Sequence, residues 1–359
     1  MRRTRKRTTA KRKTFIRLSP AGATPGYESV SEKTNLEQRA YEAGLRDAER
    51  RPVPPGFDPK KWLNALWNEW LSSTNGTRRN RDVYAKLGKR YVAGYRGRAG
   101  QTVMPFVPVP TRQSLAAVVT VMNEEQTLPD VLEQLNRLPL DEIVIVVNGS
   151  TDGSFSVARR ASNAVIVHFP QPLGHDVGRA IGAKLARSDL LLFLDGDIPV
   201  GAEQLVPFVA VLAAGADIAL NDISPYIGPF GERDAVTVMK EFLNRALGRP
   251  DLQANSLTAV PHAMSRKALE TIGYKNLIVP PLAQTIAIRR GLNIECAASV
   301  DVVTRNRIKT WNAGDSNPVS RLIVGDHVEA LSALTREAGS RLDFPDSMRV
   351  RRAAGGSDP

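Results

Sequence analysis

Hydrophobic residues along the middle of the chain occur in short runs, and each run is followed by a segment with helical spacing. Four runs are rich in Val, Ile, Leu or Ala, and they cover residues 115–123, 142–148, 164–169 and 190–195. Between them, segments such as 127–138 and 176–188 repeat apolar residues every three or four positions. Strands that are apolar on both faces and alternate with helices are typical of parallel sheets. The pattern therefore predicts an α/β fold with a mostly parallel sheet and helices on both faces.

The first third of the chain has a different pattern. Residues 35–51 predict a polar helix, and residues 58–73 predict an amphipathic helix whose apolar stripe includes Leu63, Trp67 and Leu71. Proline residues at 105, 108 and 110 then mark a boundary. We expect three parts: an N-terminal extension (a disordered arm plus helices) at 1–110, an α/β domain at 111–330, and a C-terminal helix and tail at 331–359.

Charge separates the N-terminal extension from the rest of the chain. Residues 1–110 hold 24 Lys and Arg against 9 Asp and Glu, although the whole chain has a net charge of +12. Eight of the first 13 residues are basic, which predicts a disordered arm. Such an arm could contact an anionic membrane surface or a protein partner, and it would attract nucleic acid without sequence preference.

The remaining composition points to the cytoplasm. The chain has a single cysteine, Cys296, so no intramolecular disulfide can form, and a reducing compartment fits best. No secretory signal is recognisable, and the longest apolar run, 205–216, is too short to span a bilayer. We expect a cytoplasmic protein, with peripheral membrane association through the basic arm as an alternative.

Polar clusters follow all four predicted strands. They are Asn123-Glu124-Glu125, the segment 148–152, Gly174-His175-Asp176, and Asp195-Gly196-Asp197. The carboxyl ends of parallel strands meet at one edge of a sheet, where ligands of open α/β sheets bind. Helices start directly after these clusters, and their free N–H groups favour phosphate. Two carboxylates one residue apart would suit a divalent cation bound to a diphosphate.

These segments resemble family-2 glycosyltransferases of the GT-A fold, which is a Rossmann-like arrangement. The resemblance covers about residues 115–200 through "VVTVMNEEQTLPDVLEQL", "EIVIVVNGSTDGS" and "PLGHDVGRAIGAKLARSDLLLFLDGDI", and more weakly the segment from "PHAMSRKALETIG" onward. It implies a metal-dependent transferase that takes a nucleoside-diphosphate sugar as donor and uses Mn²⁺ or Mg²⁺. The acceptor, either a hydroxyl or a phosphate, is not identified by the resemblance.

The resemblance also implies roles for individual residues. Asp195 and Asp197 would form the metal-binding D-x-D, with His262 as the better candidate for a histidine ligand and His327 as the second. The residues implied to contact the nucleotide sugar are Thr120, Met122, Asn123, Glu124, Asn148, Ser150, Asp152, Gly174, Arg179 and Asp195. From the residue types alone, Asp152 could equally cap the helix that follows it.

The sequence departs from the family pattern in two places. Val147 and Asn148 stand where many relatives carry two Asp residues. Gln284 stands near the position where many inverting relatives carry a carboxylate that acts as the catalytic base. Asp222 is a candidate substitute for that base, whereas an acceptor that is already anionic would need none. Two other functions stay open: a nucleotidyltransferase of the same fold, and a non-catalytic module that binds a nucleotide sugar and docks a partner.

Overall fold

The computed structural model of the protein describes residues 30–74, 82–99, 106–161, 163–304 and 318–342, together with positions 346, 349, 350 and 353. The basic arm expected at the start of the chain lies outside the described residues. Its disorder and its partners therefore stay predictions.

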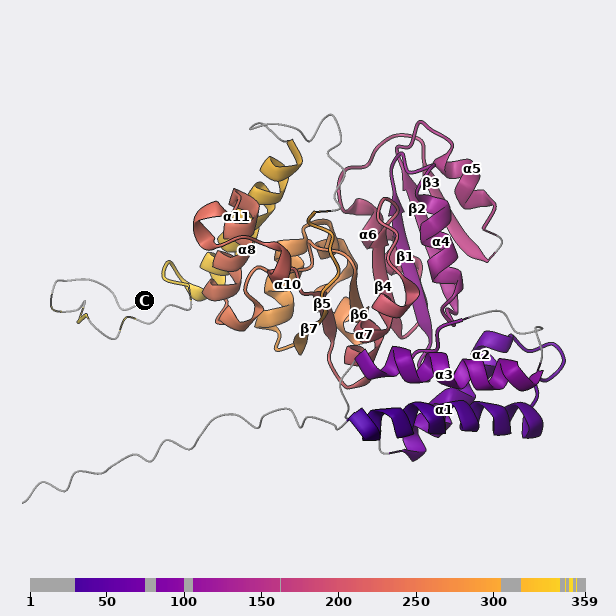
Figure 1. The fold of residues 1–359 in the computed structure, drawn as a ribbon. Helices are drawn as coiled ribbons and strands as arrows, with labels where there is room; N and C mark the ends of the chain where they lie inside the picture. The colour runs from indigo at the N-terminus through magenta and orange to yellow at the C-terminus, as the bar shows by residue number, and fades with distance from the viewer. Residues whose placement is uncertain are drawn as a thin grey trace, which may run out of the picture.

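A seven-stranded sheet forms the centre of the described structure (Figure 1). Only β6 runs antiparallel to its neighbours, so the expected mostly parallel sheet is confirmed. All four strands predicted from the hydrophobic runs are present as β1 to β4. In spatial order the strands are β3 (Ala164–Phe169), β2 (Glu142–Asn148), β1 (Leu115–Val121), β4 (Leu190–Asp195), β6 (His262–Ser265), β5 (Ile218–Asn221) and β7 (Ile294–Ala298).

Helices cover both faces of the sheet, as the continuous apolar runs predict. In β1, Ala117 and Val119 point to one face and Ala116 and Val118 to the other, and all four are buried. The first face packs against α4 (Leu128–Asn136), α5 (Ser154–Arg159) and α7 (Ala202–Ala213). The second face packs against α6 (Val177–Leu185), α9 (Arg266–Ile272) and α10 (Pro280–Arg289).

Two further helices lie outside the second face. Helices α8 (Ala235–Ala246) and α11 (Pro318–Ala338) share a small core with each other, and α10 packs against it. Helix α11 runs through residue 330, so the expected start of a C-terminal segment at 331 falls inside this helix. Short 3₁₀ turns occupy Ser224–Tyr226, Phe230–Glu232, Pro250–Leu252 and Tyr274–Ile278. Among the described helices, none combines the length and the hydrophobicity that crossing a bilayer requires.

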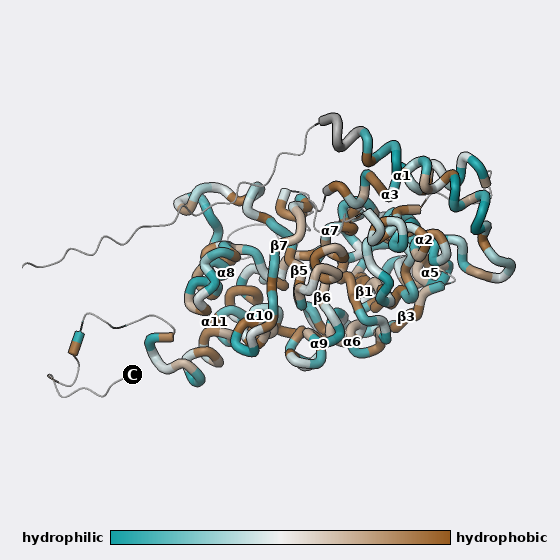
Figure 2. The backbone as a smooth tube through the Cα atoms, turned by 90° about the horizontal axis from the view of Figure 1, so that it is seen from below, coloured by the Kyte–Doolittle hydropathy of each residue, from teal (hydrophilic) through white to brown (hydrophobic). Residues whose placement is uncertain are grey.

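The N-terminal extension contributes three helices: α1 (Val30–Arg50), α2 (Pro59–Ser73) and α3 (Asp82–Ala99). The predicted apolar stripe of α2 is confirmed, since Leu63, Trp67 and Leu71 are all buried in the core shared with α4 and α7. Figure 2 shows the mixture of hydrophilic and hydrophobic positions along α1 and α3, whereas the strands are mostly hydrophobic. Helix α3 was not predicted from the sequence.

Helices α1 and α3 lie side by side with glycines at the contact, which gives a test of this packing. A Cβ atom on Gly94 would lie 2.0 Å from the backbone oxygen of Tyr41, whereas a Cβ on Gly97 would meet only the Tyr41 hydroxyl at 3.5 Å. We expect Gly94→Ala to lower the free energy of unfolding by about 2–3 kcal/mol through overpacking. Gly97→Ala should raise it by up to about 1 kcal/mol, because Ala favours helix. Urea denaturation checks both, and equal effects would contradict the close helix contact.

Candidate active site

A cavity of about 460 Å³ opens at the carboxyl ends of β1, β2 and β4, and we call it the strand-end pocket. Eight of the residues expected at a nucleotide-sugar or metal site line it. They are Thr120, Met122, Glu124, Asn148, Gly174, Arg179, Asp195 and Asp197. Six others from the sequence analysis are not among its described lining residues, namely Asn123, Ser150, Asp152, Asp222, His262 and His327.

Asn123, Ser150 and Asp152 join the first two strand-end loops. The Asn123 side chain accepts a hydrogen bond from the backbone N–H of Thr151 at 2.8 Å, and the Ser150 hydroxyl accepts one from the Asn123 N–H at 3.1 Å. Asp152 accepts from the N–H groups of Ser154 and Glu125, which lowers its pKa although burial opposes the shift. Asp152 therefore binds the N–H of Ser154, the first residue of α5, and holds the first loop, which favours the capping interpretation left open by its sequence position.

Asn148 lines the pocket and also fixes the third loop. Its amide nitrogen donates to the carbonyl oxygen of Gly174 at 2.9 Å, and its amide oxygen accepts from the N–H of Leu173 at 2.8 Å. Gly174 has a φ of 110°, a conformation that favours glycine. An Asn supplies both a donor and an acceptor, so at this position it can bridge two backbone groups that a carboxylate could not satisfy together.

The carboxylate of Asp195 is held from two sides. The Thr120 hydroxyl donates to Asp195 Oδ1 at 2.6 Å, and Arg179 Nη2 lies 3.1 Å from Asp195 Oδ2. The next residue, Gly196, is fixed against β1, because its N–H donates to the Thr120 carbonyl oxygen at 2.8 Å. A Cβ on Gly196 would lie 3.1 Å from a methyl group of Val121. A side chain at this position of the Asp-Gly-Asp turn would press on β1, so a glycine suits the close packing there.

Arg179 is the centre of a buried charge network at the start of α6. The residue is only 5% exposed, and its Nη1 atom lies 2.6 Å from Asp176 Oδ1. Asp176 in turn contacts His175 Nδ1 at 2.7 Å. Burial alone would raise the pKa of Asp176, but the charges of Arg179 and His175 outweigh it and lower that pKa. The hydrogen bond to Asp176 raises the pKa of His175, so the network favours the ionised form of each group.

The pocket fits a divalent cation that binds together with a diphosphate. Within the described residues, no group of three His, Cys, Asp or Glu side chains is arranged to hold a metal ion alone. Asp195 and Asp197 nevertheless both line the pocket, and Mg²⁺ is commonly bound by one or two carboxylates, phosphate oxygens and water. The carboxylates present therefore supply part of a coordination shell that a phosphate-bearing ligand would complete.

His262, the first candidate for a histidine ligand, is a buried residue at the start of β6. It is 2% exposed and stacks on Phe193 with ring centroids 4.9 Å apart. Its Nδ1 atom is 3.2 Å from the Ala259 carbonyl oxygen. Burial, aided by the nearby Arg179 charge, lowers the pKa of His262 to about 3, so the ring is neutral. A neutral ring is the form that binds metals, but His262 does not line the pocket and its role as a ligand stays a prediction.

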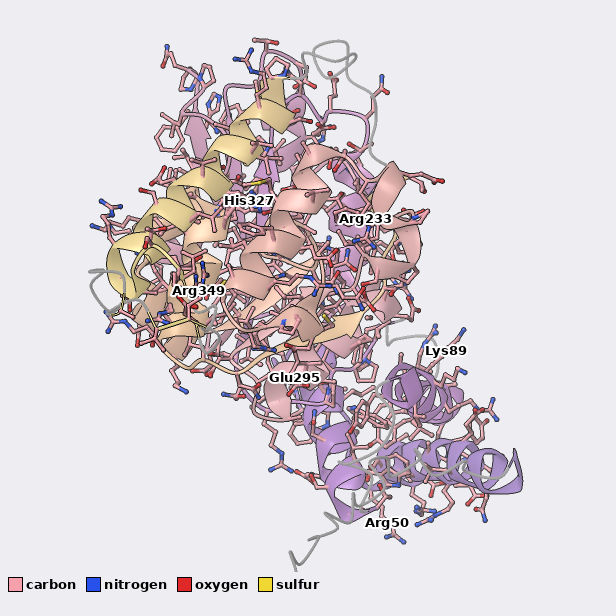
Figure 3. The ribbon with its side chains drawn as sticks, turned by 90° about the vertical axis from the view of Figure 1, so that its left-hand side faces the viewer. Arg50, Lys89, Arg233, Glu295, His327 and Arg349 are labelled. Carbon is pink, nitrogen blue, oxygen red and sulfur yellow. The ribbon has the colours of Figure 1, made fainter. Side chains whose placement is uncertain are left out.

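His327, the second histidine candidate, is completely buried in α11. Its Nδ1 atom lies 2.7 Å from the carbonyl oxygen of Ile323, one turn earlier in the same helix. Figure 3 shows His327 at the level where α11 and α8 run side by side. The structure gives no reason to assign it to a metal.

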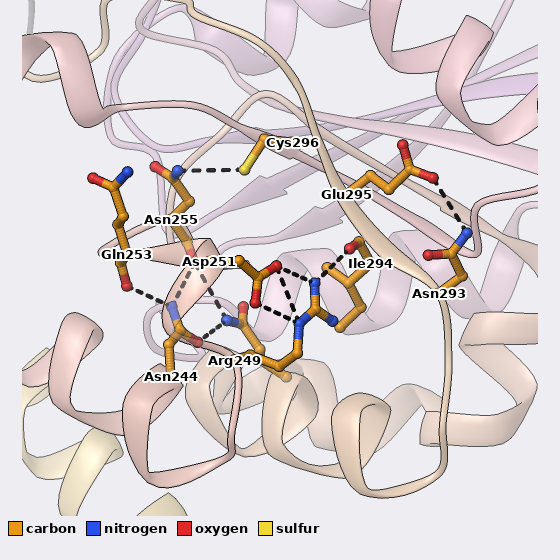
Figure 4. A network of polar contacts seen from close by, with 10 residues as sticks. Asn244, Arg249, Asp251, Gln253, Asn255, Asn293, Ile294, Glu295 and Cys296 are labelled. Atoms are coloured by element: carbon orange, nitrogen blue, oxygen red, sulfur yellow. Dashed lines mark hydrogen bonds and ion pairs between the residues drawn. The ribbon is translucent and has the colours of Figure 1, made fainter. Parts of the chain in front are cut away.

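Asp222 and Gln284 belong to a polar network away from the pocket lining. Asp222 Oδ1 accepts hydrogen bonds from the Ser224 N–H and from the side-chain amide of Asn255, both at 3.0 Å. Gln284 is buried and bonds to Asn244 and to the N–H of Leu257. Figure 4 shows Asn244 and Asn255 in this network. Both candidate positions for a catalytic base therefore hold structural hydrogen bonds, and Asp222 as a base stays a prediction.

Three lining residues come from segments that lie far along the chain from the four strand ends. Thr258 comes from the loop before β6, and Val319 and Ile323 come from the first turns of α11. They line the pocket together with the strand-end residues. Neither a motif nor a strand end marks them, since packing of distant segments brings them to the site.

Comparisons with known proteins identify a family and individual proteins that this chain resembles. Residues 116–273 match the family described as glycosyl transferase family 2. The chain is 24% identical over 193 residues to undecaprenyl-phosphate 4-deoxy-4-formamido-L-arabinose transferase of Proteus mirabilis, covering 51% of this chain and 59% of that protein. It is 25% identical over 141 residues to glycosyltransferase AglJ of Haloferax volcanii, covering 39% and 45%. The chain thus spans less than two thirds of either relative.

A solved structure also aligns with this fold. It is glucosyl-3-phosphoglycerate synthase from Mycobacterium tuberculosis in complex with Mn²⁺, uridine diphosphate and glucosyl-3-phosphoglycerate. The identity is 19%, the TM-score is 0.44, and the alignment covers 66% of this chain and 82% of that one. This similarity is too low to support a statement about function. The family match, in contrast, includes the first four strands, the Asp-Gly-Asp turn and Arg179. The resemblance found in the sequence is thereby confirmed, since residues 116–273 match glycosyl transferase family 2.

Proposed function

We propose that the protein is a metal-dependent glycosyltransferase that moves a sugar from a nucleoside-diphosphate sugar to a hydroxyl or phosphate acceptor. The observation that carries this proposal is the strand-end pocket, where Asp195, Asp197 and Arg179 from the family-2 domain lie together. Acidic side chains would hold Mg²⁺ or Mn²⁺, and the guanidinium group would face the diphosphate. This charge pattern suits a leaving group that becomes more negative as the sugar departs.

Four residues of the pocket have a defined part in the proposed reaction. An acceptor oxygen attacks the anomeric carbon, and the bond from that carbon to the diphosphate oxygen breaks, with its electron pair leaving on the diphosphate. A bound divalent ion would supply positive charge at that leaving group. Asp197 and Asp195 would hold the ion, while Thr120 and Arg179 fix the orientation of the Asp195 carboxylate through the contacts described above.

Two observations support a choice between a phosphate and a hydroxyl acceptor. The names of the curated relatives include transferases that act on undecaprenyl phosphate. In this chain, the position where inverting relatives carry a carboxylate is taken by Gln284, which is committed to structural hydrogen bonds. A phosphate acceptor is ionised before it reacts and needs no base, so we favour it over a hydroxyl.

A nucleotide panel tests the proposed function. We expect one nucleoside diphosphate to raise the melting temperature in the presence of Mn²⁺ and much less in its absence. Binding at 100 times Kd stabilises the folded state by about 2.7 kcal/mol, which corresponds to roughly 5–10 °C for a domain of this size. Chromatography of the same samples with the matching nucleotide sugar should show release of the nucleoside diphosphate.

Other outcomes of this panel would contradict the proposal. Release of pyrophosphate from a nucleoside triphosphate and a sugar phosphate would indicate a nucleotidyltransferase. Tight binding of a nucleotide sugar that persists without any release, across phosphate and hydroxyl acceptors, would indicate a non-catalytic module. Absence of any metal-dependent nucleotide binding would refute the donor site itself.

A further inference from the structure

Acidic side chains outnumber basic ones in the strand-end pocket. Its described lining contains four acidic and two basic side chains: Glu124, Asp176, Asp195, Asp197, His175 and Arg179. Arg179 is only 5% exposed and is paired with both Asp176 and Asp195, so its charge is already balanced within the protein. His175 is therefore the other side chain of this lining that can bring positive charge to an anionic ligand.

The side chain of His175 is accessible in this pocket. The residue follows Gly174 in the third strand-end loop and stands just before α6. Its side chain is 42% exposed, compared with 6% for Arg179 and 3% for Asp176. A ligand can therefore reach the imidazole ring without displacing any buried side chain, which is not true of the guanidinium group.

One nitrogen of the His175 ring is held by the protein, and the other is left for a ligand. Nδ1 lies 2.7 Å from Asp176 Oδ2, while the other oxygen of that carboxylate lies 2.6 Å from Arg179 Nη1. Because a carboxylate only accepts hydrogen bonds, Nδ1 carries a hydrogen in both the neutral and the charged ring. Nε2 is then the atom that gains or loses the proton, and it makes no hydrogen bond with a described residue.

The charged groups around the ring favour its protonated form. The hydrogen bond to Asp176 raises the pKa of His175 above its usual value, and the negative charges of Asp176 and Asp195 act in the same direction. Burial and the charge of Arg179 oppose this shift but do not cancel it. Asp326 on α11 also interacts with the ring: burial and the charge of Asp176 raise the pKa of Asp326 to about 6, and the charge of His175 lowers it. Asp326 is thus mainly ionised at pH 7 and adds negative charge near the imidazole.

We propose that His175 in its protonated form binds the diphosphate of the donor, with Nε2–H donating a hydrogen bond to a phosphate oxygen, so that donor affinity depends on pH. The inference rests on the proposed function and adds a residue to its donor site. In the transfer, the bond from the anomeric carbon to the diphosphate oxygen breaks and its electron pair leaves on that oxygen. The imidazolium keeps its proton throughout and balances the charge that the diphosphate gains.

The pH dependence of nucleotide binding tests this proposal. The full chain is titrated in a calorimeter with the nucleoside diphosphate found in the panel, in the presence of Mg²⁺, at pH 6.5, 7.5 and 9. The same titrations are made with His175→Gln, which keeps a hydrogen-bonding amide but removes the charge. At pH 6.5 we expect the wild type to bind about ten-fold more tightly than the variant, as a hydrogen bond to a charged group commonly allows. At pH 9 the ring is neutral, so the two affinities should be nearly equal. Titration of the nucleotide itself affects both proteins alike and cancels in their ratio.

Two further variants separate the charge of His175 from a purely structural role. His175→Lys carries a charge across this pH range, because the pKa of lysine is about 10.4. We expect it to bind the nucleotide nearly as tightly as the wild type at pH 6.5 and to keep that affinity at pH 9. His168→Gln is the matched control, since His168 is a half-buried residue of β3 that stacks on Phe155 and is not among the described lining residues. It should show the same pH dependence as the wild type.

The outcomes distinguish the failure of this inference from the failure of the proposed function. If the nucleotide binds but the wild type and His175→Gln have equal affinities at every pH, His175 does not contact the diphosphate and the donor site stands without it. If His175→Gln binds the nucleotide normally and slows turnover only with a hydroxyl acceptor, the ring acts as a base on the acceptor, which also overturns the inference. If no nucleotide binds to the wild type at any pH, the donor site and the proposed function are wrong together.

Discussion

Replacing Asp197 by Asn is expected to reduce sugar transfer by about 10³-fold without unfolding the protein. The side chain is half-buried and lines the strand-end pocket directly after β4. An amide keeps the shape of the carboxylate but removes the charge that would hold a divalent ion against the diphosphate. Loss of a single electrostatic contact to developing charge commonly costs about 10²–10³ in rate, and loss of the ion would add to this.

The measurement does not require a known acceptor. In wild-type protein, Mn²⁺ should tighten nucleoside diphosphate binding in calorimetry, whereas in Asp197→Asn the affinities with and without Mn²⁺ should be nearly equal. Asp152→Asn is the matched control, because it changes a carboxylate near the same sheet edge that only caps α5 and holds the first loop. It should cost about 1 kcal/mol of stability and leave the effect of Mn²⁺ intact. An unchanged effect of Mn²⁺ in Asp197→Asn would exclude this residue as a metal ligand.

The contrast between Asp197 and Asp152 shows how far sequence reasoning reaches in the site. Both follow a buried strand, and in a parallel sheet both must lie near one edge. The sequence therefore predicted the edge correctly. It could not tell a carboxylate that faces a cavity from one that accepts backbone N–H groups of a neighbouring loop. That difference depends on the conformation of each loop. Asn123 is an example: its φ is 58°, and its side chain accepts a hydrogen bond from the second loop.

The fold likewise has elements that the sequence predicted and elements that it did not. Strands β1 to β4 were predictable because each is apolar on both faces, a pattern that only a covered sheet explains. Helix α3 was missed because it contains Gly88, Gly94 and Gly97, residues that lower helix propensity. The structure shows the reason for one of them, since α1 lies so close that no side chain fits at Gly94. Tertiary packing therefore overrides local preference at this position.

The pocket wall formed by α11 lay beyond prediction for another reason. Val319 and Ile323 belong to a helix more than 100 residues after the Asp-Gly-Asp turn, and nothing in their own sequence refers to a ligand. Periodicity could predict that this segment is helical, but the face that meets the pocket is set by contacts with α8 and α10. The residues of this wall are thus less visible in the sequence than the polar residues at the strand ends.

Removal of the Arg179 charge is expected to have the largest effect on stability. Arg179→Met leaves the buried Asp176 carboxylate without its closest cation, and breaking a buried ion pair from one side typically costs about 3–5 kcal/mol. Urea denaturation at pH 7 measures this loss. Asp176→Asn in the same background removes the unpaired charge, and Asn also tolerates the left-handed backbone at this position, where φ is 60°. The double variant should therefore recover much of the lost stability.

The pH dependence of the stability difference between Arg179→Met and wild type shows whether Arg179 acts through its charge. In the wild type the folded pKa of Asp176 is below its unfolded value of about 3.9, so its contribution is complete above that value and is lost as the pH falls through the folded pKa. In Arg179→Met the dominant remaining influence is burial, which raises the folded pKa above the unfolded one. The variant should then gain stability relative to wild type as the pH is lowered from 7 toward 4. A constant difference between the two proteins across that range would show that Arg179 stabilises the fold by packing, and that the network around Asp195 is not electrostatic in origin.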